Sequence, residues 1–276
     1  MDGVDFGLTA LDYARYRAGF PNSLFERLAA HGIGLPGQAV VDLGTGTGAL
    51  ARSFARRGCR VIGIDPSQSM LDQARQLTGA DEGHVEYRLA TAENTGLPPG
   101  SADVVAAGQC WHWFDRPQTA RECARILRPA GFVLVAHFDW LPLAGNLVEA
   151  TEKLVLAYNP SWNMAGGSGL YPAWLRDLAE AGFRNIESFS YDVDVPYSPE
   201  AWRGRIRASA GVGASLPPEQ VAAFDRDLAA LLAANFPGRE LHTPHRVYAV
   251  WARPPTWTAE RKRLTFSPPC ALTNRS

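Results

Sequence analysis

The stretch VVDLGTGTGAL, residues 40–50, decides the fold of this chain. An apolar run over 38–44 predicts a buried strand, glycines follow at positions 44, 46 and 48, and a helix is expected over 49–58. Glycines between a strand and a helix let the backbone turn sharply and let a ligand lie against bare main chain. The stretch also satisfies the G-x-G-x-x-A form of the dinucleotide fingerprint through Ala49. The loop therefore predicts a nucleoside ligand but leaves its kind open.

The alternation of strand and helix continues along the chain. Strands are expected over 60–65, 85–90, 102–109 and 131–138, with helices over 66–77 and 116–127. Several of these strands are apolar throughout, which is typical of a parallel sheet covered on both faces. Helical segments over 146–158, 172–181 and 199–235 and strands over 186–197 and 246–252 follow. We predict an α/β protein with a Rossmann-like, mostly parallel seven-stranded sheet and helices on both faces.

The domain organisation follows from the same pattern. One domain is expected over 1–253, with helical elements of a substrate cap at about 141–184 and 199–235. Residues 254–276 hold four prolines and no period, so they are expected to form an irregular tail.

Composition and charge limit the partners that this chain is expected to have. The formal net charge is −1 and the pI is about 6.6, so neither nucleic acid nor an anionic membrane is favoured. The four cysteines form no CxxC pair, and the start resembles no signal peptide, so we expect reduced thiols in a cytoplasmic protein. His242 and His245 have no carboxylate at helical spacing, and no metal site is expected.

Two carboxylates flank the glycine stretch and narrow the choice of ligand. Asp42 lies two residues before the first glycine, where it would repel a pyrophosphate and attract an ammonium and a sulfonium. Asp65 ends the next strand, where a carboxylate accepts hydrogen bonds from both hydroxyls of a ribose. Asp65 can also cap the following helix, and both roles can coexist. Together these features predict an adenosine with a positively charged amino-acid tail, which fits S-adenosylmethionine.

Six segments match the motifs of one enzyme family. They are VVDLGTGTG (40–48), GIDPSQSML (63–71), ATAENTGLP (90–98), SADVVAAGQCWHWFD (101–115), ILRPAGFVLV (126–135) and LDYARYRAGFP (11–21). The chain thus resembles class I S-adenosylmethionine-dependent methyltransferases of the type 11 group, which includes ubiquinone-biosynthesis, trans-aconitate and natural-product enzymes. Ala130 replaces the family's second glycine in the fifth segment, and Ala18 replaces a proline in the last.

The resemblance implies S-adenosylmethionine as cofactor and assigns residues to it. These are Tyr16, Arg17, Asp42, Gly44, Thr45, Gly46, Gly48, Asp65, Pro66, Met70, Ala92, Glu93 and Gln109. It places Asp65 on the ribose and Met70 under the adenine. Ala92 and Glu93 are implied at the adenine edge. The segment over about 8–21 is implied to cover the cofactor as a lid, with Tyr16 on it. Arg17 would reach the methionine carboxylate, or else lie on the surface.

Methyl transfer to a hydroxyl or an amine also requires a group that accepts a proton, and histidine suits this task. His112 lies just after the strand over 102–109, whose carboxyl end faces the expected crevice, so it is the first candidate base. His137, at the end of the strand over 131–138, is the second. The alternative for His112 is a residue that shapes the wall of the pocket.

The expected activity is therefore that of a methyltransferase, EC 2.1.1.-. The segment over 157–174 is rich in aromatic residues, which suits a small aromatic or apolar metabolite, methylated on O, N or electron-rich C. A role in secondary metabolism is favoured, and the oligomeric state is left open. Arg203, Arg205 and Arg207 offer a cation for an acidic substrate group, or else form a solvated helix face. The alternative functions are a nucleotide-dependent oxidoreductase and a non-catalytic S-adenosylmethionine-binding protein.

Overall fold

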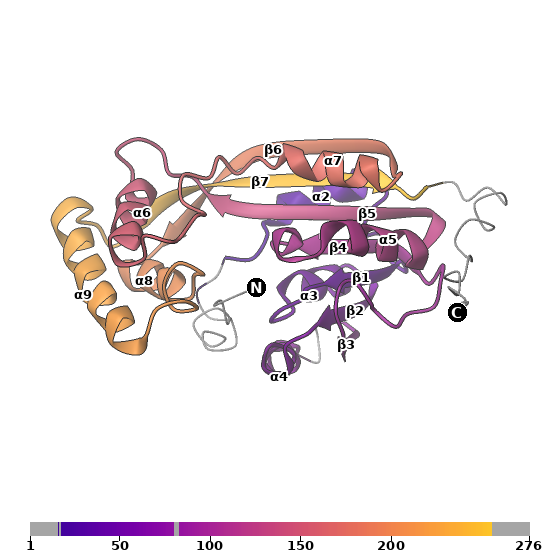
Figure 1. Cartoon of the computed structure of the whole chain (residues 1–276), viewed down its shortest axis with the longest axis horizontal. Coiled ribbons are helices and arrows are strands. Elements are labelled where there is room, and N and C mark those ends of the chain that lie inside the picture. The colour runs from indigo at the N-terminus through magenta and orange to yellow at the C-terminus, as the bar shows by residue number, and fades with distance from the viewer. Residues whose placement is uncertain (1–15, 17, 80–82, 256–276) are drawn as a thin grey trace, which may run out of the picture.

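The computed structural model describes residue 16, residues 18–79 and residues 83–255, and within them the chain forms a seven-stranded sheet (Figure 1). The strands are β1 (Ala39–Leu43), β2 (Arg60–Asp65), β3 (Val85–Leu89), β4 (Ala102–Gly108), β5 (Leu127–Trp140), β6 (Arg184–Tyr197) and β7 (Leu241–Arg253). The helices are α2 (Asn22–Ala30), α3 (Ala49–Ala55), α4 (Gln68–Leu77), α5 (Arg116–Ile126), α6 (Leu147–Tyr158), α7 (Pro172–Glu180), α8 (Pro199–Arg207) and α9 (Pro218–Asn235).

The order of the strands creates a crevice near the centre of the sheet. The order is β3-β2-β1-β4-β5-β7-β6. The first five strands run parallel, and β7 runs antiparallel to both β5 and β6. The chain order reverses between β1 and β4, and open α/β sheets bind ligands outside the carboxyl ends of the strands at such a point. The predicted fold class is confirmed.

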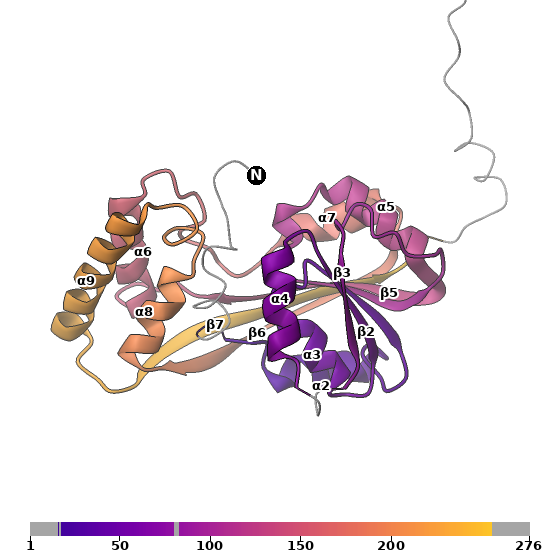
Figure 2. The ribbon, with the colours of Figure 1, turned by 90° about the horizontal axis from the view of Figure 1, so that it is seen from below.

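Helices cover both faces of this sheet (Figure 2). The apolar core has one cluster on each face, because successive side chains of a strand point to opposite sides. In β4, Val105 and Ala107 belong to the cluster beneath α5 and α7, while Val104 and Ala106 belong to the cluster beneath α2 and α3. This burial on both faces explains why the strand is apolar throughout.

A third apolar core lies at the far end of the long strands β5, β6 and β7, where α6, α8 and α9 gather (Figure 2). Trp140 at the end of β5 packs edge-on against Trp202 of α8, with ring centroids 5.6 Å apart. We call α6, α8 and α9 the cap helices. The helix α7, which lies within the expected cap range 141–184, does not join them. It packs instead on α5 and β6, because Trp174 and Leu178 are buried in the core of the sheet.

α2 begins after Pro21, which precedes it in an extended conformation. The strand expected over 131–138 begins earlier in the structure. β5 begins at Leu127 rather than at residue 131, with an irregular register against β4 between Ala102 and Val104. The predicted lid over 8–21 and the tail over 254–276 lie mostly outside the described residues. In the part of the chain that the structure describes, no helix has the length and apolar character to cross a bilayer.

Candidate active site

Two cavities meet where the chain order reverses. The first, of about 260 Å³, lies against the glycine loop and is lined in part by Asp42, Gly44 and Thr45. The second, of about 80 Å³, lies between the loop after β4 and the cap helices. Gln109 lines both cavities. A ligand in the first cavity and a ligand in the second can therefore meet beside this residue.

The glycine loop is closed by protein on one side and open on the other. Gly44 has φ 61°, and a Cβ there would lie 2.9 Å from the Cys110 Sγ and 3.0 Å from the Phe114 ring. Gly46 has φ 54°, but a Cβ there would meet nothing within 4 Å. Gly44 thus serves the packing of the protein, while the backbone at Gly46 faces space that a ligand can fill.

Asp42 is a buried acid in the wall of the first cavity. Its side chain is 1% exposed and accepts a hydrogen bond of 2.7 Å from the Thr45 hydroxyl. Burial raises the pKa of Asp42 to about 7, and the nearby Asp65 contributes in the same direction. A cationic ligand beside Asp42 would favour its ionised form.

Asp65 ties the glycine loop to the end of β2. Its two carboxylate oxygens accept hydrogen bonds from the backbone amides of Gly46 and Ser67, each at 2.9 Å. Burial raises the pKa of this carboxyl, while the two amides act against that effect. Asp65 therefore holds the loop in place at the edge of the first cavity.

The residues predicted at the adenine line neither cavity. Ser67, after Pro66, caps α4 by accepting a hydrogen bond from the Met70 amide, and the Met70 side chain is 4% exposed. Ala92 is buried in the core of the sheet. The Glu93 carboxylate accepts a hydrogen bond of 3.0 Å from the Asp115 amide at the start of α5. Their contacts in this structure are with the protein, and their adenine roles stay predictions.

The N-terminal residues are only partly described. Tyr16 has its ring against Gly204 of α8, so it contacts the cap helices. Arg17 lies outside the described residues. Phe20 lines the first cavity and packs against Phe138, with ring centroids 6.2 Å apart.

The loop GQCWHWFD (108–115) connects the two cavities. Gln109 adopts φ 63°, and its amide donates to the Ala136 carbonyl at 2.9 Å. Trp111 is fully buried and donates through Nε1 to Asp177 at 3.1 Å. His112 and Trp113 line the second cavity. Trp111 thus packs in the core, while Trp113 lines the cavity.

A polar cluster forms the floor of the second cavity. The rings of His112 and His137 lie 5.7 Å apart between their centroids. His137 Nε2 lies 3.7 Å from Asp139 Oδ2, and that oxygen accepts a hydrogen bond of 2.7 Å from the Tyr171 hydroxyl. The structure therefore brings the two candidate bases together with an acid and a phenol.

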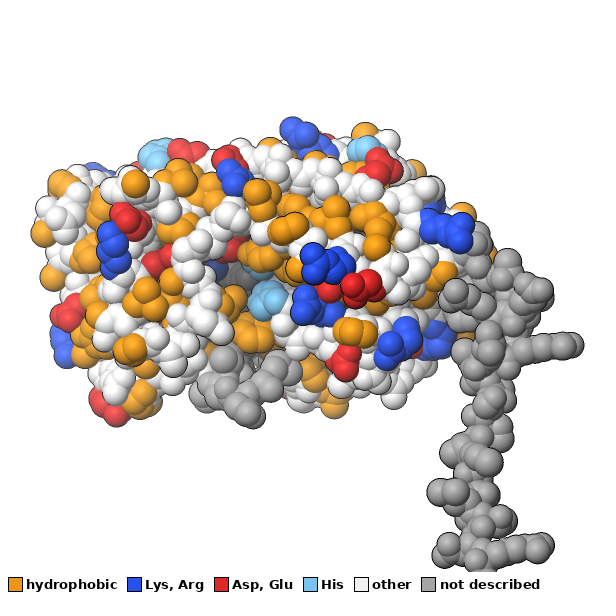
Figure 3. Space-filling model, turned by 45° about the horizontal axis from the view of Figure 1, so that its top comes forward, with side chains coloured by type: hydrophobic (Ala, Val, Ile, Leu, Met, Phe, Trp, Pro, Cys, Tyr) orange, Lys and Arg blue, Asp and Glu red, His pale blue; other side chains and the backbone are white. Residues whose placement is uncertain are grey.

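The end of β5, the segment before α7 and the helix α8 supply the other wall of this cavity. Trp140, Trp162 and Met164 are apolar lining residues. Arg205 also lines the cavity, is 8% exposed, and has its guanidinium carbon 4.6 Å from the centroid of the Trp140 ring. Figure 3 shows a histidine in a hollow edged by hydrophobic side chains. The cavity suits a small molecule with an apolar body.

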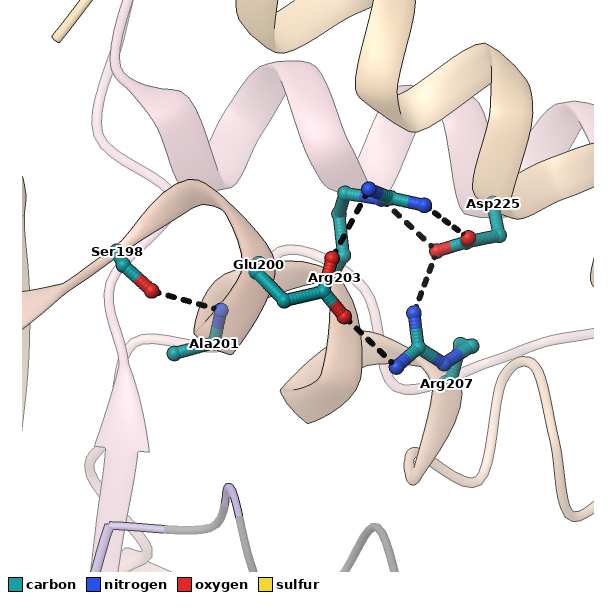
Figure 4. A network of polar contacts seen from close by, with 6 residues as sticks. All are labelled: Ser198, Glu200, Ala201, Arg203, Arg207 and Asp225. Carbon is teal, nitrogen blue, oxygen red and sulfur yellow. Dashed lines mark hydrogen bonds and ion pairs between the residues drawn. The ribbon is translucent and has the colours of Figure 1, made fainter. Parts of the chain in front are cut away.

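Arg203 and Arg207 hold α8 and α9 together (Figure 4). Both guanidinium groups donate to the Asp225 carboxylate of α9, and both also pair with Glu200. Neither arginine lines the two cavities. Of the three arginines singled out in the sequence, only Arg205 is therefore placed to meet a substrate.

Removing the shared carboxylate is expected to loosen the cap. Asp225→Ala removes the more buried of the two carboxylates that both guanidinium groups share, so we expect a loss of about 1–3 kcal/mol in the free energy of unfolding. Glu200→Ala is the control, because Glu200 is 56% exposed and an exposed pair contributes less than about 1 kcal/mol. Urea unfolding measures both variants, and equal losses would contradict the role given to Asp225.

The remaining histidines of the last strand have structural positions. His245 is 2% exposed and burial lowers its pKa to about 4, so it is neutral inside the cap end of the sheet. His242 is exposed and lies 3.2 Å from Asp194. Among the described residues, no group of three or more His, Cys, Asp or Glu side chains is arranged to hold a metal ion.

The sequence did not predict Asp139 or Tyr171 as site residues, and it offered Arg205 only as one of two alternatives. Asp139 lies two residues after His137 on one strand, and this period of two places both on the same face. The position of Asp139 could therefore have been predicted. Tyr171 reaches Asp139, and Arg205 reaches the cavity, only because of how the segment before α7 and the cap helices pack, which no local pattern encodes.

Comparisons with known proteins agree with this architecture. A family model described as a methyltransferase domain matches residues 41–135. An uncharacterized methyltransferase of Mycobacterium bovis is 37% identical over 46% of this chain and 49% of its own length. A ubiquinone biosynthesis O-methyltransferase of Xanthomonas campestris is 28% identical over 64% of this chain and 73% of its own.

A solved structure described as a type II methyltransferase of Anaeromyxobacter dehalogenans has a TM-score of 0.60 and 25% identity, over 87% of this chain and 99% of that one. The chain spans about half the length of the first curated relatives that it matches. The resemblance to S-adenosylmethionine-dependent methyltransferases is thus confirmed over residues 41–135, which match the methyltransferase domain model.

Proposed function

We propose that this protein is an S-adenosylmethionine-dependent methyltransferase that acts on O, N or electron-rich C of a small, aromatic or apolar metabolite. The observation that carries the proposal is the pair of adjoining cavities that share Gln109. One is suited to the cofactor and the other to the methyl acceptor. A role in secondary metabolism is part of the proposal. The ubiquinone biosynthesis relative makes quinone precursors the nearest alternative substrates.

The first cavity fits the proposed cofactor. The loop backbone at Gly46 faces open space, as a cradle for a ligand requires. Asp42 offers a buried carboxyl in the cavity wall to an ammonium or sulfonium, and the same group disfavours a pyrophosphate. Arg52 and Arg56 also line this cavity and would attract a carboxylate. When bound, the cofactor supplies a methyl group on a positively charged sulfur.

The second cavity fits an acceptor that has to be oriented and deprotonated. Trp113, Trp140 and Trp162 would flank a flat ring and exclude water. His112 and His137 would take up the proton of a hydroxyl or ammonium group. The cap helices would act as the substrate cap, and the N-terminal segment with Tyr16 as a lid.

Calorimetry separates this proposal from the alternatives. We expect S-adenosylhomocysteine to bind in the micromolar range and NADH to show no binding. The reverse result would make the protein an oxidoreductase. A panel of phenols, amines, indoles and acids with radiolabelled S-adenosylmethionine then tests for transfer. Tight cofactor binding with no labelled product would favour a non-catalytic binding protein.

Asp65→Ala is expected to weaken the binding of S-adenosylhomocysteine at least tenfold. The variant loses the proposed contacts to two ribose hydroxyls, worth about 1.5–3 kcal/mol for hydrogen bonds to a charged group. It also loses the tie between Gly46 and β2. Asp72→Ala is the matched control, because Asp72 lies exposed on α4 beside Arg75. Unchanged calorimetric affinity in Asp65→Ala would contradict the assignment to the ribose.

A further inference from the structure

The two histidines of the second cavity have different surroundings. The His112 ring lies 4.6 Å from the Trp113 ring, between centroids. The His137 ring lies 4.6 Å from the Tyr171 ring, and its Nε2 lies 3.7 Å from the Asp139 carboxylate. This distance is too long for a hydrogen bond, but it is within the range of an ion pair once His137 carries a second proton. A carboxylate therefore lies within this range of His137.

The Asp139 carboxylate is held in place by a rigid neighbour. The Tyr171 hydroxyl donates to Asp139 Oδ2 at 2.7 Å. The Tyr171 ring is stacked on Trp174, with centroids 4.1 Å apart and an angle of 10° between the planes. Trp174 is 3% exposed. The phenol is therefore fixed by the core of the sheet, and through it so is the carboxylate.

The geometry points to His137 as the proton acceptor of the reaction, with Asp139 as the positioning residue that stabilises its charged form and Tyr171 as the residue that holds Asp139. This inference rests on the proposed function. The Nδ1 atom of His137 is buried, and Nε2 is the nitrogen that lies 3.7 Å from Asp139 Oδ2. A proton taken up at Nε2 would therefore lie beside Asp139 Oδ2.

The proposed step is balanced without any further reactant. The proton of the acceptor O–H or N–H moves to His137 Nε2, and the lone pair left on the acceptor atom forms the bond to the methyl carbon. The bond from that carbon to sulfur breaks, and its electron pair stays on the sulfur, which leaves as a neutral thioether. The positive charge of the sulfonium thus ends on the imidazolium beside Asp139.

Other groups face His137 from the neighbouring elements. His112 comes from the loop after β4, Tyr171 and Trp174 from the start of α7, and Arg205 from α8 lines the same cavity. Across β7, His137 is paired with Tyr248. The Arg205 cation opposes the protonation of His137, so the carboxylate of Asp139 is the group that must favour it.

Histidine NMR on the full-length protein tests the coupling between Asp139 and His137. The chain is labelled with ¹³C at the histidine Cε1, with and without saturating S-adenosylhomocysteine, and His137 is assigned from the spectrum of His137→Gln. Without the carboxylate, the charged imidazole loses its partner, so the His137 titration in Asp139→Asn should shift to lower pH by about one unit. An unchanged His137 midpoint in the folded variant would overturn the inference.

A second pair in the same chain provides the control. His242 and Asp194 lie 3.2 Å apart and are 59% and 60% exposed. Asp194→Asn removes a carboxylate from this exposed pair and should leave the titration of His137 unchanged. A His137 midpoint that moves equally in both variants would show a general loss of negative charge, and it would also overturn the inference.

Two further measurements separate a failure of this inference from misfolding of a variant and from a failure of the proposed function. If Asp139→Asn does not fold, Tyr171→Phe replaces it, since this change keeps the ring stack and removes only the hydroxyl. The His137 midpoint is then expected to fall because the carboxylate is no longer held, and an unchanged midpoint overturns the inference. Failure to bind S-adenosylhomocysteine contradicts the proposed function instead, and the titration of the unliganded protein still reports on the coupling.

Discussion

His137→Gln is expected to lower kcat by at least about 100-fold, the range that a positioned general base contributes. The KM for the cofactor should stay close to that of the unchanged protein, because His137 lines the acceptor cavity and does not line the glycine-loop cavity. The measurement uses the best acceptor from the methyl-transfer panel. Glutamine retains hydrogen-bonding capacity at the site and removes the group that takes up a proton.

His112→Gln is the matched comparison for this prediction. His112 lines the same cavity, with its ring 5.7 Å from that of His137. We expect a smaller loss of kcat with a larger change in the KM of the acceptor, as for a residue of the pocket wall. A loss of kcat that is confined to His112→Gln would instead assign the base to His112, which the sequence placed first.

The fold could be predicted from the sequence because its signals are local. The apolar run before Gly44, the repeated alternation of strand and helix, and the positions of Asp42 and Asp65 at strand ends all lie in short windows of sequence. Such windows encode which strands are buried on both faces. They do not encode where a helix after the sheet will pack. The helix over 172–181 was therefore expected within the cap range, although α7 packs against α5 and the sheet.

The first cavity was predicted more completely than the second for the same reason. Asp42, Gly44 and Thr45 come from one turn between β1 and α3, so sequence neighbours are also neighbours in space. The second cavity joins β5, the segment before α7, and α8. The hydrogen bond between Tyr171 and Asp139 spans 32 residues of sequence. Only tertiary packing brings such a pair together.

Asp42→Asn is expected to make the unliganded protein more stable at pH 8. Burial raises the pKa of Asp42 from 3.8 to about 7. A carboxyl whose pKa is raised in the folded state contributes stability at pH values below its unfolded pKa, and this contribution is lost as the pH rises through about 7. The corresponding change in the free energy of unfolding is on the order of 4 kcal/mol between pH 4 and pH 8. Asparagine carries no charge anywhere between pH 4 and pH 8, and its amide oxygen can still accept the hydrogen bond from the Thr45 hydroxyl.

Urea unfolding at pH 4, 6 and 8 measures this difference. Asp103→Asn is the control of opposite sign, because the Asp103 pKa is lowered by the Ala39 amide and by Arg128 against the effect of its own burial. That carboxyl stabilises the fold at neutral pH and loses its contribution as the pH falls. Asp103→Asn should therefore be least stable, relative to the unchanged protein, at pH 8. The same pH dependence in Asp42→Asn and in the unchanged protein would contradict the buried charge at Asp42.

The same variant is expected to bind S-adenosylhomocysteine more weakly. In the unliganded protein, the ionised Asp42 destabilises the fold because it is buried beside Asp65. A bound ammonium would offset that effect, and it would also favour the loss of the proton from Asp42, so the affinity should rise with pH through about 7. Asparagine removes both the attraction and its pH dependence. If Asp42→Asn is more stable but binds S-adenosylhomocysteine more weakly, the negative charge of Asp42 contributes to ligand binding and not to the stability of the fold.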